Sequence, residues 1–271
     1  MKKLFAGAVA LVSLTVTSTV MANETITVTG SNSMSSLMEV LAETYTVKTG
    51  NFVEVQGPGS SAGIRAANEG VSMLGMASRI VQDDEIKENV HTVAMARDAI
   101  AVAVNPANGV SNLSVEQVAD IYRGEITNWA DVGGAKSPIV VITRDSASGT
   151  RAGFESTLGL TRKINGIKVS AIYPRAQVAN GNGMVKTTVA HNVYAIGYIS
   201  LGTVDESVQA LSINDVAPSV ATIQTGEYPI ARPFTLLYRD DAPAAAMAYM
   251  NWILSDEGQA IVARKGYVPV K

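Results

Sequence analysis

Three segments of the chain share one order: an apolar strand pattern, a turn of glycine and hydroxyl residues, and a helix pattern. They are "TVTGSNSMSSLMEVL" (27–41), "VEVQGPGSSAGIRAA" (53–67) and "VVITRDSASGTRAGF" (140–154). Strands that alternate with helices of this length indicate βαβ units and parallel sheets covered by helices. The sequence therefore predicts a protein of the α/β class.

Hydroxyl residues at such a turn have two ordinary explanations. A side-chain oxygen at the start of a helix can cap a free backbone N–H group. The same position can also bind an anion, because the free N–H groups and the positive end of the helix dipole point outward together. A single turn is usually a cap, but three in one chain favour a shared oxyanion, since ligands of open α/β sheets lie at the carboxyl ends of strands.

Arg144 follows the third strand pattern directly, beside Asp145. A guanidinium group can hold an oxyanion through two parallel charge-assisted hydrogen bonds. The alternative is an ion pair with Asp145 at the surface, where it contributes little to stability. We take Arg144 as the candidate cation of the anion site.

The first 22 residues have the features of a secretory signal peptide. Lys2 and Lys3 precede the apolar run "LFAGAVALVSLTV", and "VMA" (20–22) offers small residues for cleavage. The apolar run is too short to span a membrane as a helix. The chain contains 0 cysteines, so no lipid-attachment cysteine follows the cleavage site. We expect a periplasmic protein.

Two extended apolar runs, 93–105 and 232–238, can each carry the chain from one domain to another. Such crossings predict two lobes, with residues 23–97 plus 233–271 forming lobe I and residues 98–232 forming lobe II. The remaining chain is long for one core and comfortable for two domains. The ligand would then lie in the cleft between the lobes.

Several classes of function lack their usual signals. The net charge is −3 and there is no block of lysine and arginine, which argues against a nucleic-acid partner. No metal-ligand spacing or phosphate-binding loop of an ATPase is present, and we expect no cofactor. The turn "GSSAG" (59–63) formally matches the nucleophile motif of serine hydrolases, with Ser61 as nucleophile and His191 as base. This enzyme alternative rests on a short, common pattern.

Seven segments spread over the chain carry a resemblance to a known family. They are "GSNSM", "GPGSSAGIRA", "GMASR", "LSVEQVADIYRGEITNWADVGG", "TRDSASGTR", "AIGYISLG" and "LSDEGQAIVARKGYVPV". In these segments the chain resembles the PstS family of periplasmic phosphate-binding proteins. The resemblance implies a two-lobed, flytrap-like α/β fold. It also implies a non-enzymatic protein that closes on inorganic phosphate and delivers it to an inner-membrane ABC permease. We further expect a monomer.

The resemblance implies a set of phosphate-binding residues. In lobe I these are Ser33, the backbone N–H of Met34, Ser60 and Ser78; in lobe II they are Arg144, Ser148, Gly149 and Thr150. Where some members of the family have an aspartate, this chain has Arg79, which is included among the predicted contacts. Its alternative is to pair with a carboxylate and face away from the ligand.

The substitution by Arg79 bears on selectivity. Phosphate at neutral pH carries a proton and sulfate does not, so an acceptor-only carboxylate favours phosphate and repels sulfate. Without that aspartate, another acceptor is needed, and Asp145 or a serine oxygen is a candidate. A binder of sulfate or molybdate on the same fold is therefore an alternative. A secreted adhesion or signalling protein with the same fold is another.

Overall fold

The structure is a computed structural model that describes residues 25–271, so the predicted signal peptide lies outside the described residues. A single 10-stranded sheet runs through the molecule in the order β2-β1-β3-β13-β4-β10-β6-β9, with β11 and β14 added to β4. The strands of this sheet are β1 (Ile26–Gly30), β2 (Val53–Gln56), β3 (Leu74–Ala77), β4 (Val90–Val104), β6 (Val140–Arg144), β9 (Gln177–Ala179), β10 (Ala195–Ser200), β11 (Gln209–Ala210), β13 (Ala231–Arg239) and β14 (Val268–Pro269).

Eight α-helices and three short 3-10 helices in the described chain pack around this sheet. The α-helices are α1 (Asn32–Thr49), α2 (Ser60–Glu69), α3 (Val115–Arg123), α4 (Gly149–Thr157), α5 (Asn182–Ala190), α6 (Val220–Thr225), α7 (Ala244–Ile253) and α8 (Asp256–Arg264). The 3-10 helices are η1 (Asp83–Glu85), η2 (Trp129–Val132) and η3 (Leu201–Thr203). Two small sheets pair β5 (Asn112–Leu113) with β12 (Ser212–Ile213) and β7 (Thr161–Ile164) with β8 (Ile167–Ser170).

The α/β class predicted from the three turns is confirmed. Strand β1 pairs in parallel with both β2 and β3, and β6 pairs in parallel with β10 and β9. Helices α1 and α2 follow β1 and β2 and pack on those strands, as βαβ units require. Helix α3 begins at the N-cap Ser114, whose hydroxyl accepts the N–H of Gln117, and ends at Gly124 in the left-handed conformation.

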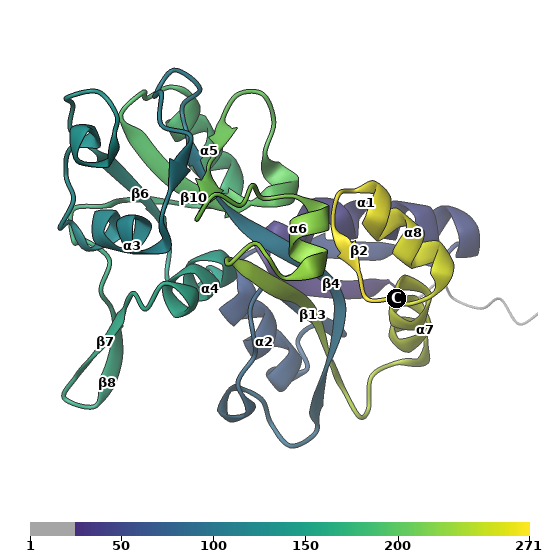
Figure 1. The fold of residues 1–271 in the computed structure, drawn as a ribbon. Coiled ribbons are helices and arrows are strands. Elements are labelled where there is room, and N and C mark those ends of the chain that lie inside the picture. The colour runs from purple at the N-terminus through teal and green to yellow at the C-terminus, as the bar shows by residue number, and fades with distance from the viewer. Residues whose placement is uncertain (1–24) are drawn as a thin grey trace, which may run out of the picture.

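The two predicted crossing segments are the strands β4 and β13, which pair antiparallel between residues 90–99 and 231–239. They lie side by side through the middle of the molecule, between the part that carries α1, α2, α7 and α8 and the part that carries α3, α4 and α5 (Figure 1). The register shifts between Phe234 and Thr235, which bends the ribbon. Asp98 of β4 lies opposite Arg232 of β13 in this register.

The buried apolar side chains form separate cores on the two sides of this ribbon. One core gathers Met34, Leu37 and Leu41 of α1 with strand residues of β1 and β3 and with Tyr249 of α7. The largest cluster gathers side chains of α3, α4 and β10 around Trp129 and Tyr122. The fold is therefore two-lobed, with β4 and β13 shared between the lobes. Among residues 25–271, no helix combines the length and apolar character needed to cross a membrane.

Candidate functional site

The N-termini of α1, α2 and α4 meet where the two lobes touch. A Cβ placed on Gly149, at the start of α4, would overlap the Oγ of Ser60 and approach the Ser60 Cβ to 2.8 Å. The N–H of Ser61 donates to the carbonyl oxygen of Ala147 at 3.3 Å. The hydroxyl-rich turns that are far apart in the sequence are therefore in contact in the fold.

Capping explains only one of the three turns. The hydroxyl of Ser148 caps α4 by accepting the N–H of Arg151. The N-cap residues of α1 and α2 are Ser31 and Gly59, and neither makes a side-chain cap hydrogen bond. The remaining hydroxyls are therefore available for contacts with each other or with a ligand.

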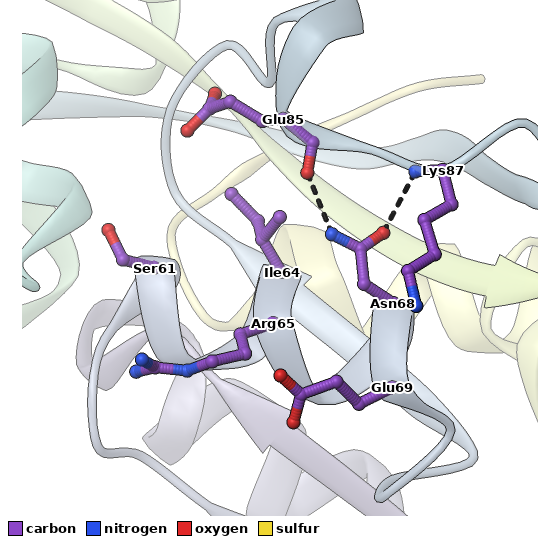
Figure 2. Close-up of a pocket in the computed structure, with 7 residues that line it drawn as sticks. All are labelled: Ser61, Ile64, Arg65, Asn68, Glu69, Glu85 and Lys87. Atoms are coloured by element: carbon purple, nitrogen blue, oxygen red, sulfur yellow. Dashed lines mark hydrogen bonds between the residues drawn. The ribbon is translucent and has the colours of Figure 1, made fainter.

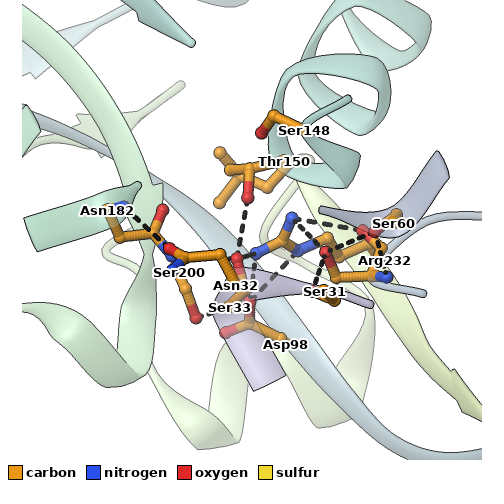
Figure 3. A network of polar contacts seen from close by, with 12 residues as sticks. Ser31, Asn32, Ser33, Ser60, Asp98, Ser148, Thr150, Asn182, Ser200 and Arg232 are labelled. Atoms are coloured by element: carbon orange, nitrogen blue, oxygen red, sulfur yellow. Dashed lines mark hydrogen bonds and ion pairs between the residues drawn. The ribbon is translucent and has the colours of Figure 1, made fainter. Parts of the chain in front are cut away.

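These hydroxyls form one network across the two lobes (Figure 3). Ser33 Oγ of α1 lies 2.8 Å from Thr150 Oγ1 of α4. Ser31 Oγ donates to Ser78 Oγ at 2.7 Å, and Ser60 Oγ accepts the N–H of Ser78 at 3.0 Å. Each of these five side chains is at most 3% exposed, so the network is shielded from bulk water.

Arg144 projects into this region from the end of β6 and is only 2% exposed. Its Nη1 donates to Asn182 Oδ1 at 3.1 Å, while Nη2 lies 3.6 Å from Asp145 Oδ2. Its Nε is buried and has no hydrogen-bond partner in the structure. Burial lowers the pKa of Arg144, Asp145 opposes this effect, and the positive charge of Arg232 adds to it. Arg144 is thus a buried cation whose hydrogen bonds are incomplete.

Arg232 is a second buried arginine at the site, and the sequence analysis missed it. It is 4% exposed, and its Nη2 and Nε both donate to Asp98 Oδ2, at 2.8 and 3.1 Å. The same guanidinium group reaches the predicted site, because Nη2 donates to Ser33 Oγ at 3.0 Å and Nη1 to Ser78 Oγ at 3.3 Å. Asp98 and Arg232 each interrupt an apolar strand with a charge, which is the sequence signal that could have identified them.

Asn182, at the start of α5, was also missed. Its Nδ2 donates to Ser33 Oγ at 2.9 Å, and its backbone N–H donates to Asn32 Oδ1 at 3.0 Å. It follows strand β9 and Gly181, so the segment repeats the strand, turn and helix order of the three hydroxyl turns. The signal was present, but with an amide in place of a hydroxyl.

The predicted residues do not all lie in the network. Ser33, Ser60, Ser78, Thr150 and Gly149 are brought together, as described above. The N–H of Met34 donates to the Ser31 carbonyl oxygen at 3.1 Å. Its contact with an anion stays a prediction.

Arg79 lies apart from the hydroxyl network. Both of its Nη atoms pair with the carboxylate of Glu85, at 2.5 and 2.6 Å. Burial favours the neutral form of Glu85, but hydrogen bonds from Arg79 and the Gln82 N–H, with the charges of Arg79 and Lys168, together outweigh it and lower the pKa of Glu85. The pairing corresponds to the alternative in which this arginine binds a carboxylate, and its contact with a ligand stays a prediction.

An open pocket of about 740 Å³ borders the network. Its lining combines residues of both lobes, among them Arg79, Ser146, Lys168 and Arg232. Because Arg232 also contacts Ser33 and Ser78, this pocket lies next to the buried polar network.

Ser61, the candidate hydrolase nucleophile, lines this pocket and also a second one on α2 (Figure 2). The other residues of that pocket are Ile64, Arg65, Asn68, Glu69, Glu85 and Lys87, and none of them is a histidine. His191 lies at the end of α5, where its Nδ1 lies 2.8 Å from the carbonyl oxygen of Thr187. The geometry therefore does not assemble a serine nucleophile with its base. Within the described residues, no group of three or more potential metal-ligating side chains comes together.

The chain is similar to known binding proteins over most of its length. Residues 15–257 match the PBP superfamily domain. The phosphate-binding protein PstS of Bacillus subtilis is 30% identical over 258 residues, which cover 92% of this chain and 82% of that protein. A second PstS, from Borreliella burgdorferi, is 26% identical and covers 91% of this chain and 90% of its own.

Two solved structures extend this similarity to the fold. A substrate-binding protein of a phosphate ABC transporter from Clostridium perfringens, solved with bound phosphate, is 36% identical with a TM-score of 0.86. The match covers 92% of this chain and 100% of that one. An ABC-type phosphate transport receptor from Vibrio cholerae is 40% identical with a TM-score of 0.77, covering 91% and 100% of the two chains.

Proposed function

Because the chain belongs to the PstS family of phosphate-binding proteins, we propose that it binds inorganic phosphate between its two lobes as the substrate-binding component of an ABC importer. It is a binding protein rather than an enzyme, as its relatives are. The family relationship and the phosphate-bound relative favour this function over a sulfate binder or a serine hydrolase.

One observation carries the proposal: two buried guanidinium groups join the same polar network at the lobe interface, Arg232 through Ser33 and Ser78 and Arg144 through Asn182. Arg144 and Arg232 are 2% and 4% exposed, and burial together with repulsion by the charge of Arg232 lowers the pKa of Arg144. Buried cations are costly unless they are paired and fully hydrogen-bonded. An oxyanion between them would neutralise excess charge and accept hydrogen bonds from the surrounding hydroxyl groups.

The proposed mechanism is closure of two lobes on the anion. Lobe I, residues 23–97 and 233–271, supplies Ser33, the Met34 N–H, Ser60 and Ser78, and lobe II, residues 98–232, supplies Arg144, Ser148, Gly149 and Thr150. An anion bound to one lobe gains the remaining donors only when the other lobe swings in. Phosphate thus favours the closed state by its differential affinity for the two states. We further propose that Arg79 contacts the phosphate at the border of the site.

The proposed role in an importer also implies a cellular location and a protein partner. We propose that the mature protein works in the periplasm after cleavage of residues 1–22, as a monomer that delivers phosphate to an inner-membrane ABC permease. The relatives from Clostridium perfringens and Vibrio cholerae are a substrate-binding protein of a phosphate ABC transporter and an ABC-type phosphate transport receptor. Docking on the permease would favour reopening of the lobes.

The test is calorimetric titration of ligand-stripped protein with phosphate. We expect one phosphate per chain with an affinity at least in the micromolar range typical of specific binding, corresponding to about −8 kcal/mol. Small-angle X-ray scattering with and without phosphate should show a more compact protein in the bound state. Absence of phosphate binding by folded, stripped protein would refute the proposal.

A further inference from the structure

The proposed phosphate site needs a group that accepts a hydrogen bond from a protonated oxygen of the ligand. Phosphate near neutral pH keeps a proton and sulfate keeps none, so such an acceptor separates the two anions. Position 79, at the border of the network, is an arginine paired with Glu85 and cannot accept a hydrogen bond. The acceptor must therefore be another group, and the hydrogen bonds of the network indicate which one.

Ser33 cannot easily supply this acceptor. Its Oγ already accepts from Nη2 of Arg232 at 3.0 Å and from Nδ2 of Asn182 at 2.9 Å. A hydroxyl has two acceptor sites and one proton, so Ser33 is left as a donor. The orientation of the Asn182 amide is fixed, because its Oδ1 receives a hydrogen bond from Arg144, a group that can only donate.

Ser78 is restricted in the same way. Its Oγ accepts from Ser31 Oγ at 2.7 Å and from Nη1 of Arg232 at 3.3 Å, so both of its acceptor sites are occupied. Ser60 Oγ accepts the N–H of Ser78 and lies 3.4 Å from the Ser78 hydroxyl, which can donate to it. Ser33 and Ser78 thus have no acceptor site left for a protonated oxygen of the ligand.

Asp145 is already engaged through both of its oxygens. Its Oδ1 accepts the N–H of Ala147 at 2.9 Å, and its Oδ2 lies 3.6 Å from Nη2 of Arg144. Its side chain is 32% exposed, so water can also satisfy it. Asp145 is therefore a weak candidate for the buried acceptor of a hydrogen bond from the protonated oxygen of phosphate.

Asp98 has the free acceptor. Its side chain is 1% exposed, and its Oδ2 accepts three hydrogen bonds, two from Arg232 and one from Ser200 Oγ at 2.8 Å. Its Oδ1 is buried without a hydrogen-bond partner, although the N–H of Leu201 is close enough to the carboxyl group to influence its pKa. Within the part of the chain that the structure describes, only this acceptor and the Nε donor of Arg144 are buried side-chain atoms without a partner.

A ligand that satisfies both orphan atoms must carry an acceptor and a donor. Protonated phosphate carries both, whereas sulfate carries acceptors alone. Asp98 is also close to the site, because Nη2 of Arg232 bridges its carboxylate, at 2.8 Å, to Ser33 Oγ, at 3.0 Å (Figure 3). We propose that Asp98 accepts the hydrogen bond from the protonated oxygen of phosphate and excludes sulfate from the site.

The environment of Asp98 suits an acceptor of a proton. Burial raises its pKa above the ordinary value, although Arg232, Ser200 and the Leu201 N–H act in the opposite direction. A carboxylate with a raised pKa is a more basic hydrogen-bond acceptor than an ordinary one. Its charge would also repel a ligand with no proton to share. This inference rests on the proposed function, whose own test is phosphate binding.

The experiment is titration of the wild type and of Asp98→Asn with phosphate and with sulfate at neutral pH. In the variant, Arg232 and Ser200 hold the amide oxygen at the Oδ2 position, so the NH₂ group occupies the Oδ1 position and donates. We expect the ratio of phosphate affinity to sulfate affinity to fall about 100-fold, since a buried acceptor becomes a donor. Asp145→Asn is the matched control and should leave this ratio unchanged.

Two results would overturn the assignment. If Asp98→Asn strengthens both anions equally, Asp98 only neutralises Arg232. If Asp145→Asn abolishes the discrimination instead, the acceptor is Asp145. Should Asp98→Asn not fold, the wild type still tests the idea, because arsenate should compete with phosphate while sulfate and selenate should not. Sulfate competing as well as phosphate would refute the acceptor and leave the proposed function standing. No phosphate binding at all would refute the function itself.

Discussion

Replacement of Arg144 by methionine should weaken phosphate binding and leave the stability of the ligand-free protein almost unchanged. The substitution keeps an apolar stem of similar length and removes the charge. For binding, a desolvated anion would lose its charged partner, on the scale of breaking a buried pair, about 3–5 kcal/mol. This corresponds to a loss in affinity of roughly 100- to 4,000-fold.

The expectation for stability follows from the partners of Arg144. The variant loses one hydrogen bond to Asn182 and an ion pair with Asp145 at 3.6 Å, together worth about 1–2 kcal/mol. It gains relief from a buried N–H without a partner, on the order of 1–3 kcal/mol, and from repulsion by Arg232. The opposing effects nearly cancel, so the free energy of unfolding should change by less than about 1 kcal/mol.

The assay combines calorimetric titration of phosphate with urea unfolding of stripped protein. Asp145→Asn controls for the exposed partner of Arg144 and should change affinity far less than Arg144→Met. If Arg144→Met keeps phosphate affinity within tenfold of wild type, Arg144 does not bind the anion. If the ligand-free variant unfolds with a large loss of stability, Arg144 stabilises the fold rather than the bound anion.

Three further substitutions test other parts of the site. Thr150→Val removes the hydroxyl that meets Ser33 across the lobes and should cost about 1–3 kcal/mol of phosphate binding, measured by the same titration. Gly149→Ala should also weaken phosphate binding, because the added Cβ would overlap Ser60. Gly183→Ala on α5 is the control, since its Cβ would meet open space and should leave phosphate binding unchanged. Equal effects of the two substitutions would contradict the close approach of Gly149 to Ser60. Arg232→Met should destabilise the protein by about 3–5 kcal/mol, since Asp98 is left buried and unpaired. Because Arg232 lowers the pKa of Asp98, that pKa should lie still higher in the variant, so the loss relative to the wild type should grow as the pH rises above the wild-type pKa of Asp98. Melting curves of the two proteins against pH that show the opposite trend would contradict it.

Local signals in the sequence were sufficient to predict the elements and half of the network. The start of α3 at Ser114 and its end at Gly124 follow from capping chemistry within a few residues. The meeting of the three hydroxyl turns follows from a topological rule, because parallel strands bring their carboxyl ends to one edge. Both inferences need only the order of residues along the chain.

The missed residues depend on contacts that the sequence does not encode locally. Asp98 and Arg232 are 134 positions apart, and each lies in a strand made mostly of apolar residues. Their pairing is set by the register of β4 against β13, which periodicity alone does not fix. Asn182 was missed for a different reason, because the turn before α5 carries an amide where the other three turns carry hydroxyls.

The position of the Asp98–Arg232 pair links the anion site to the ribbon that joins the lobes. Both residues lie on the shared strands β4 and β13, while the guanidinium group of Arg232 extends to Ser33 and Ser78 of the α1 lobe. Asn182 and Thr150 approach the same Ser33 hydroxyl from the other lobe. Any opening of the lobes must therefore break hydrogen bonds that orient the donors for the ligand. An anion that strengthens these contacts stabilises the closed form, and closure in turn orients the donors, so binding and closure are two aspects of one equilibrium.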